Sequence, residues 1–188
     1  MRVYVIRHGE SETNLKGQWT GWIDVSLTEK GKSDAKAAGE YLKNVTFQKI
    51  YTSDLKRARQ TAEAALPDCH YETTAALREI NVGSLARKPL SIITNVEKVN
   101  ASKEGYGIYG GETRTEFADR IREFVKRLEG ETHETVALFS HEGWLREMLD
   151  IVMGESMPRA KIHCGNCTIA VFEAKNGIWR LHSWINLS

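Results

Sequence analysis

The sequence lacks an excess of charge of either sign. Lys and Arg number 26 against 25 Asp and Glu, which gives a formal net charge of +1. A chain so close to neutrality gives no sign of the basic surface that nucleic acids or membrane surfaces attract. It also contains no apolar run near the roughly 20 residues that a membrane-spanning helix needs. We therefore expect neither a nucleic-acid partner nor a membrane.

Cysteine is scarce and odd in number. The three residues, Cys69, Cys164 and Cys167, give no disulfide framework. Cys164 and Cys167 have the spacing of a redox motif, but the motif leads into the final predicted hairpin instead of opening a helix after a strand, and there is no second pair for zinc. We expect structural cysteines with reduced thiols. The first apolar run is shorter than that of a signal peptide, so the expected location is cytoplasmic.

Repeats, linkers and low-complexity segments are absent, so residues 1–188 are expected to form a single domain. Apolar runs predict buried strands, and spacing of three and four predicts helices between them. Thr28 is the expected N-cap of the first long helix, and Ser53 or Asp54 that of the next. The expected strands cover 3–6, 49–53, 135–140, 167–173 and 178–185. One expected helix follows Thr28 and runs through Leu42, another runs through Ala58, Ala62 and Ala65 toward Pro67, and two more include 117–128 and 145–152.

This alternation of strands and helices predicts an α/β fold. We expect a three-layer α/β/α sandwich with a mixed, mostly parallel central sheet, in which a turn at 175–177 makes the last two strands a hairpin. Periodicity fails at about 84–111, where we expect a short cap or lid region.

Potential cations follow three of the predicted strands, which points to an anion. Arg7 and His8 end the first strand, and His141 ends another. Arg57 lies in the first turn of a helix, where a cation is disfavoured by roughly 0.3–1 kcal/mol unless an anion binds there. Ligand sites of α/β sheets lie beyond the carboxyl ends of the strands. We therefore expect these four side chains, both histidines exposed, to converge on a phosphate-sized pocket.

Residues 7–14, Arg-His-Gly-Glu-Ser-Glu-Thr-Asn, resemble the signature of the histidine phosphatase superfamily, the phosphoglycerate mutase-like proteins. The resemblance extends over nearly the whole chain and its ordered set of motifs is highly specific. Further segments that match the family in order are 21–31, 52–62, 77–79, 110–113 and 140–141.

The resemblance implies a role for each matching residue. His8 would be the nucleophile that forms a phosphohistidine, while Arg7, Arg57 and His141 would hold the phosphoryl oxygens. Glu79 would exchange the proton with the leaving oxygen and with water. Asn14 and Thr20 match positions that line the phosphate pocket. The implied activity is hydrolysis of a phosphomonoester of a small phosphorylated metabolite, with no cofactor and no metal.

Glu142 departs from the family, which usually has glycine after the second histidine. A carboxylate pointed at a phosphate site would cost affinity. If the carboxylate turned outward, the backbone N–H of Glu142 could still donate to the phosphate, so we include Glu142 among the substrate-binding candidates. A second reading is therefore a catalytically impaired protein that only binds a phosphorylated ligand.

Two further readings remain. In mutases the acid corresponding to Glu79 precedes an Arg-His-Tyr-Gly-type segment and a longer basic insertion, whereas residues 80–83 are Ile-Asn-Val-Gly and the excursion is short. A phosphatase is therefore favoured over a phosphoglycerate mutase. His8, His141 and Glu79 also have the composition of a two-histidine, one-carboxylate metal site, but the two arginines beside them argue against a cation. The substrate and the oligomeric state stay open.

Overall fold

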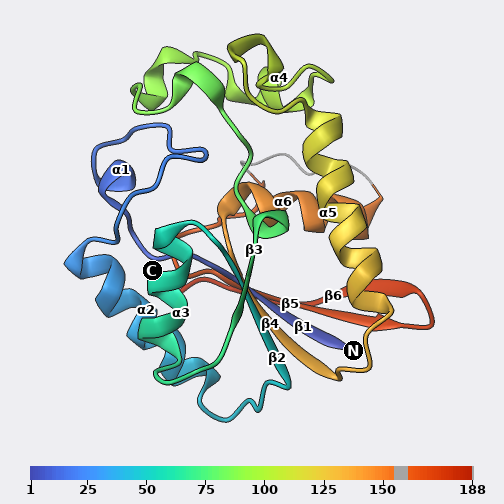
Figure 1. Ribbon diagram of the computed structural model, residues 1–188. Coiled ribbons are helices and arrows are strands. Elements are labelled where there is room, and N and C mark those ends of the chain that lie inside the picture. The colour runs from blue at the N-terminus through green and yellow to red at the C-terminus, as the bar shows by residue number, and fades with distance from the viewer. Residues whose placement is uncertain (155–160, 188) are drawn as a thin grey trace.

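The computed structural model describes residues 1–154 and 161–187 and contains a six-stranded mixed sheet of strand order β3-β2-β4-β1-β5-β6 (Figure 1). The first four strands in that order pair in parallel, β5 is antiparallel to β1, and β6 is antiparallel to β5. This confirms the predicted mixed sheet. The strands are β1 (Arg2–Arg7), β2 (Lys49–Ser53), β3 (Glu72–Thr74), β4 (Thr135–Ser140), β5 (Ile169–Lys175) and β6 (Ile178–Ile185).

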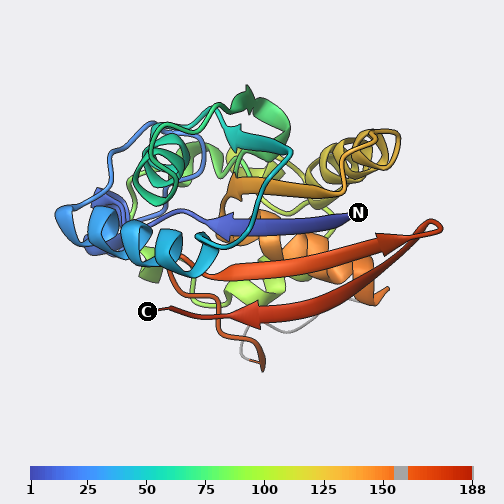
Figure 2. The ribbon, with the colours of Figure 1, turned by 90° about the horizontal axis from the view of Figure 1, so that it is seen from below.

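Helices cover both faces of the sheet (Figures 1 and 2). Val3 and Val5 of β1 pack in one core with α5 and α6, whereas Tyr4 and Ile6 pack in a second core with α2 and α3. Alternate strand residues point to opposite faces, so a strand with four apolar residues in succession needs helices on both sides. The α-helices are α1 (Glu12–Leu15), α2 (Glu29–Leu42), α3 (Lys56–Ala65), α4 (Val96–Ala101), α5 (Arg114–Glu129) and α6 (Glu142–Met153).

The helix starts match the predictions in one case and not in the other. Thr28 caps α2, because its side chain accepts a hydrogen bond from the backbone N–H of Gly31. The prediction that Ser53 or Asp54 caps α3 is wrong: Leu55 is the N-cap and makes no side-chain cap hydrogen bond. Asp54 instead forms an ion pair with Arg78 at 2.6 Å.

The segment 84–111 lies at the top of Figure 1, next to the start of α5. It contains α4 and short 3₁₀ helices, which the sequence pattern did not resolve. Tyr106 packs there with Val82 and Leu85 in a small third core. The 3₁₀ helices described for residues 1–154 are η1 (Ala75–Leu77), η2 (Gly83–Leu85), η3 (Leu90–Ile92) and η4 (Gly107–Tyr109).

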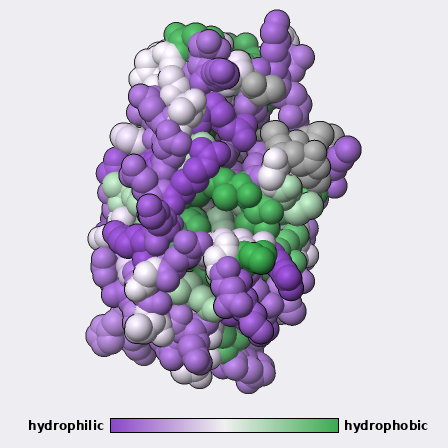
Figure 3. All heavy atoms as spheres, turned by 90° about the vertical axis from the view of Figure 1, so that its right-hand side faces the viewer, coloured by the Kyte–Doolittle hydropathy of each residue, from purple (hydrophilic) through white to green (hydrophobic). Residues whose placement is uncertain are grey.

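The right-hand side of Figure 1 presents a mainly hydrophilic surface, with hydrophobic residues gathered near its middle (Figure 3). Within residues 1–154 and 161–187, no helix has both the length and the apolar character needed to cross a membrane.

Candidate active site

The structure brings the four predicted cationic residues together at one edge of the sheet. Arg7 and Ser140 are register partners at the ends of β1 and β4, so the residues that follow them, His8 and His141, leave the sheet side by side. Their ring centroids lie 5.2 Å apart. From the first turn of α3, the Nε of Arg57 donates a hydrogen bond of 3.3 Å to Nε2 of His8.

The expectation that both histidines are exposed is wrong. His8 is 4% exposed, and His141 and Arg57 are fully buried. Neighbours from elsewhere in the fold contact both rings: Arg57 of α3 donates to His8, and the hydroxyl of Ser53 at the end of β2 lies 2.9 Å from Nε2 of His141. Burial, with the charges of Arg57 and Arg7, lowers the pKa of His8 well below its usual 6.5. Burial and Arg57 lower the pKa of His141 in the same way, so both imidazoles are neutral at pH 7.

The hydrogen bonds of His8 assign its tautomer. Nδ1 lies 2.7 Å from the carbonyl oxygen of Gly9, which can only accept, so Nδ1 carries the proton. Nε2 is then the nitrogen with the lone pair, and it accepts from Arg57. Burial lowers the pKa of Arg57 to about 10, which leaves this guanidinium charged at pH 7.

Two buried nitrogens close to His8 lack partners. Nε of Arg7 and Nδ1 of His141 have no hydrogen-bond partner in the described chain. The other nitrogen of His141, Nε2, lies 2.9 Å from the hydroxyl of Ser53. A buried donor without an acceptor costs about 1–3 kcal/mol. An oxyanion that accepts from Arg7 would remove that cost.

These groups open onto a pocket of about 350 Å³. His141 is not among its lining residues and lies against the ring of His8 instead. The other predicted site residues all line it: Arg7, His8, Asn14, Thr20, Arg57, Glu79 and Glu142.

Glu79 reaches the pocket because Gly143 leaves room for it. Its Oε2 accepts from the backbone N–H of Gly143 at 3.2 Å, and its Oε1 accepts from that of Ile80 at 2.9 Å. A Cβ on residue 143 would lie 2.1 Å from Oε1 of Glu79. The first turn of α6 therefore places the carboxylate by direct contact.

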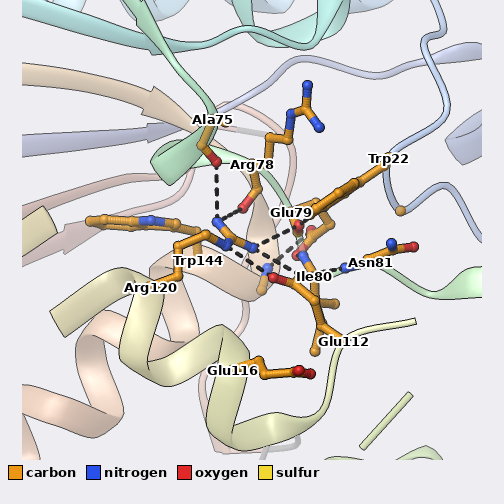
Figure 4. A network of polar contacts seen from close by, with 12 residues as sticks. Trp22, Ala75, Arg78, Glu79, Ile80, Asn81, Glu112, Glu116, Arg120 and Trp144 are labelled. Atoms are coloured by element: carbon orange, nitrogen blue, oxygen red, sulfur yellow. Dashed lines mark hydrogen bonds and ion pairs between the residues drawn. The ribbon is translucent and has the colours of Figure 1, made fainter. Parts of the chain in front are cut away.

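Arg120 of α5 holds the backbone that carries Glu79, and sequence reasoning missed it (Figure 4). The Arg120 guanidinium forms an ion pair with Glu112 at 3.0 Å. The Glu112 carboxylate in turn accepts a hydrogen bond from the backbone N–H of Asn81 at 2.7 Å. The only sequence signal was an arginine beside the apolar stripe of an amphipathic helix. Arg120 donates to the carbonyl oxygens of Ala76 and Arg78 at 3.0 Å and of Glu79 at 3.2 Å.

Asn166 and Trp22 add two further contacts around the site. Asn166 Nδ2 donates to the carbonyl oxygen of His8 at 3.1 Å. The indole N–H of Trp22 donates to the carbonyl oxygen of Glu79 at 2.7 Å, although Trp22 is not among the lining residues. Trp19 does line the pocket.

The Glu142 carboxylate faces Arg7 rather than turning outward. One oxygen lies 3.1 Å from Nη1 of Arg7, and the other accepts from Nε of Arg146 at 2.8 Å. Two guanidiniums therefore share this carboxylate.

No three His, Cys, Asp or Glu side chains of the described residues are grouped so that they could hold a metal ion. His8, His141 and Glu79 therefore do not form the metal-binding arrangement that their composition allowed. Cys164 and Cys167 are buried and free, and burial raises their pKa values to about 11 and about 12. This state agrees with a structural role.

The chain has the fold of the histidine phosphatase superfamily. Residues 3–187 match the model of the histidine phosphatase superfamily (branch 1), and the chain belongs to that family. Its members among the similar proteins are phosphatases and mutases, which supports a phosphoryl-transfer enzyme.

A curated relative, the probable phosphoglycerate mutase GpmB of Salmonella choleraesuis, is 28% identical over 195 residues, which cover 98% of this chain and 90% of the relative. A mutant phosphoserine phosphatase from Entamoeba histolytica, solved in complex with phosphoserine, has a TM-score of 0.85 at 24% identity, covering 99% of this chain and 97% of that one. A phosphoglycerate mutase from Bacillus anthracis has a TM-score of 0.85 at 22% identity, covering 97% and 92%. These two structures support the same fold.

Proposed function

We propose that the protein hydrolyses a phosphomonoester of a small metabolite through a phosphohistidine at His8, without a metal ion. The observation that carries the proposal is the state of His8 Nε2. This nitrogen carries the lone pair of the neutral imidazole, which accepts a hydrogen bond of 3.3 Å from Arg57 Nε in a pocket that Arg7 also lines. A neutral imidazole beside two guanidiniums can attack a phosphorus atom whose negative oxygens the guanidiniums hold.

In the first step, Nε2 of His8 bonds to phosphorus while the ester P–O bond breaks, and Glu79 gives its proton to the leaving oxygen. In the second step, water attacks the phosphohistidine, the N–P bond breaks, and Glu79 takes the proton of the water. Arg7, Arg57 and His141 stabilise the charge on the non-bridging oxygens in both steps. Asn14 and Thr20 line the same phosphate pocket.

We also propose that residues 1–188 act as one unit in which residues 84–111 form a cap. Leu90, Val96 and Tyr106 of this segment line the pocket, which supports the assignment. A mutase has to protect its phosphoenzyme from water, whereas a phosphatase has to admit water. The short segment after Glu79, without a basic insertion, favours the phosphatase. The runner-up is a phosphoglycerate mutase, because a curated relative carries that name.

The test is to trap the phosphoenzyme. The protein is mixed with a ³²P-labelled phosphomonoester and denatured in alkali, where a phosphohistidine survives, and one sample is then acidified. We expect label that acid removes, its loss in His8→Ala, its retention in His182→Ala, and phosphate release that resists chelators. 3-Phosphoglycerate mutase activity is assayed in parallel, and isomerisation faster than phosphate release would favour the runner-up. A protein that binds phosphomonoesters but neither becomes labelled nor releases phosphate would be a binding protein only.

A further inference from the structure

The pocket has a charged end and an apolar end, and the apolar end restricts which alcohol portion a substrate can have. Arg7, His8 and Arg57 form the charged end beside Glu79 and Glu142. The apolar lining comes from three separate segments: the stretch after β1, the residues after Glu79, and the cap. Its members are Trp19, Ile80, Val82, Leu90, Val96 and Tyr106.

Contacts within the wall hold its two aromatic rings in place. The rings of Trp19 and Tyr106 meet edge to face with centroids 5.6 Å apart. The hydroxyl of Tyr106 donates to Oδ1 of Asn100 at 3.1 Å, so its polar end is engaged within the protein and its ring borders the pocket. Tyr106 is 1% exposed, which fits a fixed wall rather than a mobile surface group.

The charged groups that line the pocket leave no cation for a second anion. In the part of the chain that the structure describes, the lining cations are Arg7 and Arg57, and both belong to the phosphoryl end. The other two charged lining residues, Glu79 and Glu142, are carboxylates. Arg87 and Lys88 of the cap are exposed and are not among the lining residues. A second negative group on the substrate would therefore meet carboxylates, apolar side chains or the neutral polar side chains of Asn14, Gln18 and Thr20, but no further cation.

We propose that the substrate is a phosphomonoester whose alcohol portion is apolar and carries no second negative charge. The inference rests on the proposed function, because it takes Arg7 and Arg57 as the ligands of the phosphoryl group. Its reason is differential binding: the apolar wall gains from covering a hydrocarbon group, whereas a carboxylate would lose water there without gaining a cation to pair with.

The test uses a matched pair of substrates, benzyl phosphate and 4-carboxybenzyl phosphate, whose leaving alcohols differ by one remote carboxylate. We expect kcat/KM to be at least about tenfold higher for benzyl phosphate, which corresponds to one tenfold step in binding. Equal values, or a preference for the carboxylated substrate, would overturn the inference. Calorimetry with the two corresponding phosphonates, which cannot be hydrolysed, measures the same preference without turnover. If the proposed catalysis were wrong but the inference right, calorimetry would still show tighter binding of the benzyl phosphonate. No phosphoenzyme would then be trapped.

A cation added to the wall sharpens the test. Leu90 lines the pocket and is 46% exposed, so Leu90→Lys places an ammonium at the rim without burying it. In this variant we expect the ratio of kcat/KM for benzyl phosphate to that for 4-carboxybenzyl phosphate to fall by about fivefold. The ratio of the binding constants of the two phosphonates should fall by the same factor. Ile108→Lys is the control, because Ile108 is an apolar cap residue that is 67% exposed and outside the pocket lining. An unchanged preference in Leu90→Lys, or the same change in both variants, would contradict a selective apolar wall.

Discussion

The Glu142 carboxylate lies 3.1 Å from the Arg7 guanidinium inside the candidate active site. Arg7 also donates to the carbonyl oxygen of Cys164, and Arg146 holds the other oxygen of Glu142 at 2.8 Å. Arg7 is therefore fixed in place before any phosphate arrives. The arrangement has a cost, because the carboxylate that orients Arg7 also repels the anion that Arg7 has to bind.

The first prediction is that Glu142→Gln binds phosphate more tightly. The amide keeps an oxygen that accepts from Arg7 and removes one negative charge, a gain of about 1 kcal/mol for partly exposed groups at a water-like dielectric constant. We expect the inhibition constant of inorganic phosphate to fall by about fivefold. Competition against a phosphomonoester measures it, and Glu123→Gln on the exposed face of α5 controls for net charge. Equal constants in the two variants would show that Glu142 does not oppose the anion.

The positions of Arg7, His8 and His141 could be predicted because they depend on local pattern. Each follows a run of apolar residues long enough to mark a buried strand, and the carboxyl ends of parallel strands meet at one edge of a sheet. The alternation of strands and helices likewise predicted the layers. The order of the strands in the sheet depends on contacts between residues far apart in the sequence, and no local pattern predicted it.

Other features escaped prediction for reasons of the same kind. β3 and η1 have three residues each, which is too short for a periodicity to show. The contacts of Arg120 reach carbonyl groups about 40 positions away in the chain, and nothing near Arg120 in the sequence marks them. The sequence does not predict the burial of His8 and His141, because it depends on contacts with residues far away in the chain, among them Arg57 and Ser53.

The second prediction concerns the thiols. Burial raises the pKa of Cys164 to about 11 and that of Cys167 to about 12, so neither forms a thiolate at pH 8. Cys69 is only partly buried. With Ellman's reagent at pH 8 we expect Cys69 to react first in the folded protein, and the other two only after urea is added. Mass spectrometry identifies the labelled positions. Rapid labelling of Cys164 or Cys167 in the folded protein would contradict a structural role.

The third prediction is that buried neutral histidines make the protein less stable in acid. An unfolded histidine binds a proton near pH 6.5, whereas His8 and His141 have much lower pKa values when folded. Below pH 6.5 the unfolded chain therefore holds more protons. The free energy of unfolding should fall as the pH falls, by about 1.4 kcal/mol per pH unit for each such histidine.

Urea unfolding between pH 5.5 and 7.5, in a buffer without phosphate, measures this slope. His141→Asn should lose one histidine's share of it, and His182→Asn, at an exposed position, should lose almost none. Burial also raises the pKa of Glu147, but this residue is common to all three proteins and cancels in the comparison of slopes. Identical slopes in the wild type and His141→Asn would mean that His141 is already protonated in the folded state or titrates normally.

The fourth prediction concerns Glu79 as the proton donor. A poor leaving group needs its proton in the transition state, whereas a nitrophenolate leaves without one. Glu79→Gln should therefore lower kcat/KM for benzyl phosphate by about 100-fold or more and lower that for 4-nitrophenyl phosphate much less. Steady-state kcat/KM for the two substrates gives the ratio. Equal losses would assign Glu79 to binding rather than to proton transfer.

The last prediction treats Arg120 as a positioning residue that acts through Glu79. Without its guanidinium, the carbonyls of Arg78 and Glu79 lose donors, and Glu112 loses an ion pair of 3.0 Å. Glu79 should then sit less often where the leaving oxygen needs it. We expect Arg120→Met to slow benzyl phosphate by about tenfold and 4-nitrophenyl phosphate by less than about threefold, a smaller form of the Glu79→Gln pattern.

The control for this prediction is Arg122→Met, on the same helix, where the arginine is exposed and pairs only with nearby Asp119 in the described chain. It should change neither rate by more than about twofold. A loss of stability alone would reduce the fraction of folded enzyme and lower the rates with both substrates by the same factor. The ratio of the two rates therefore separates positioning from unfolding. A double variant with Glu79→Gln completes the argument: if Arg120 acts through Glu79, removing Arg120 should no longer alter the ratio once the carboxylate is gone.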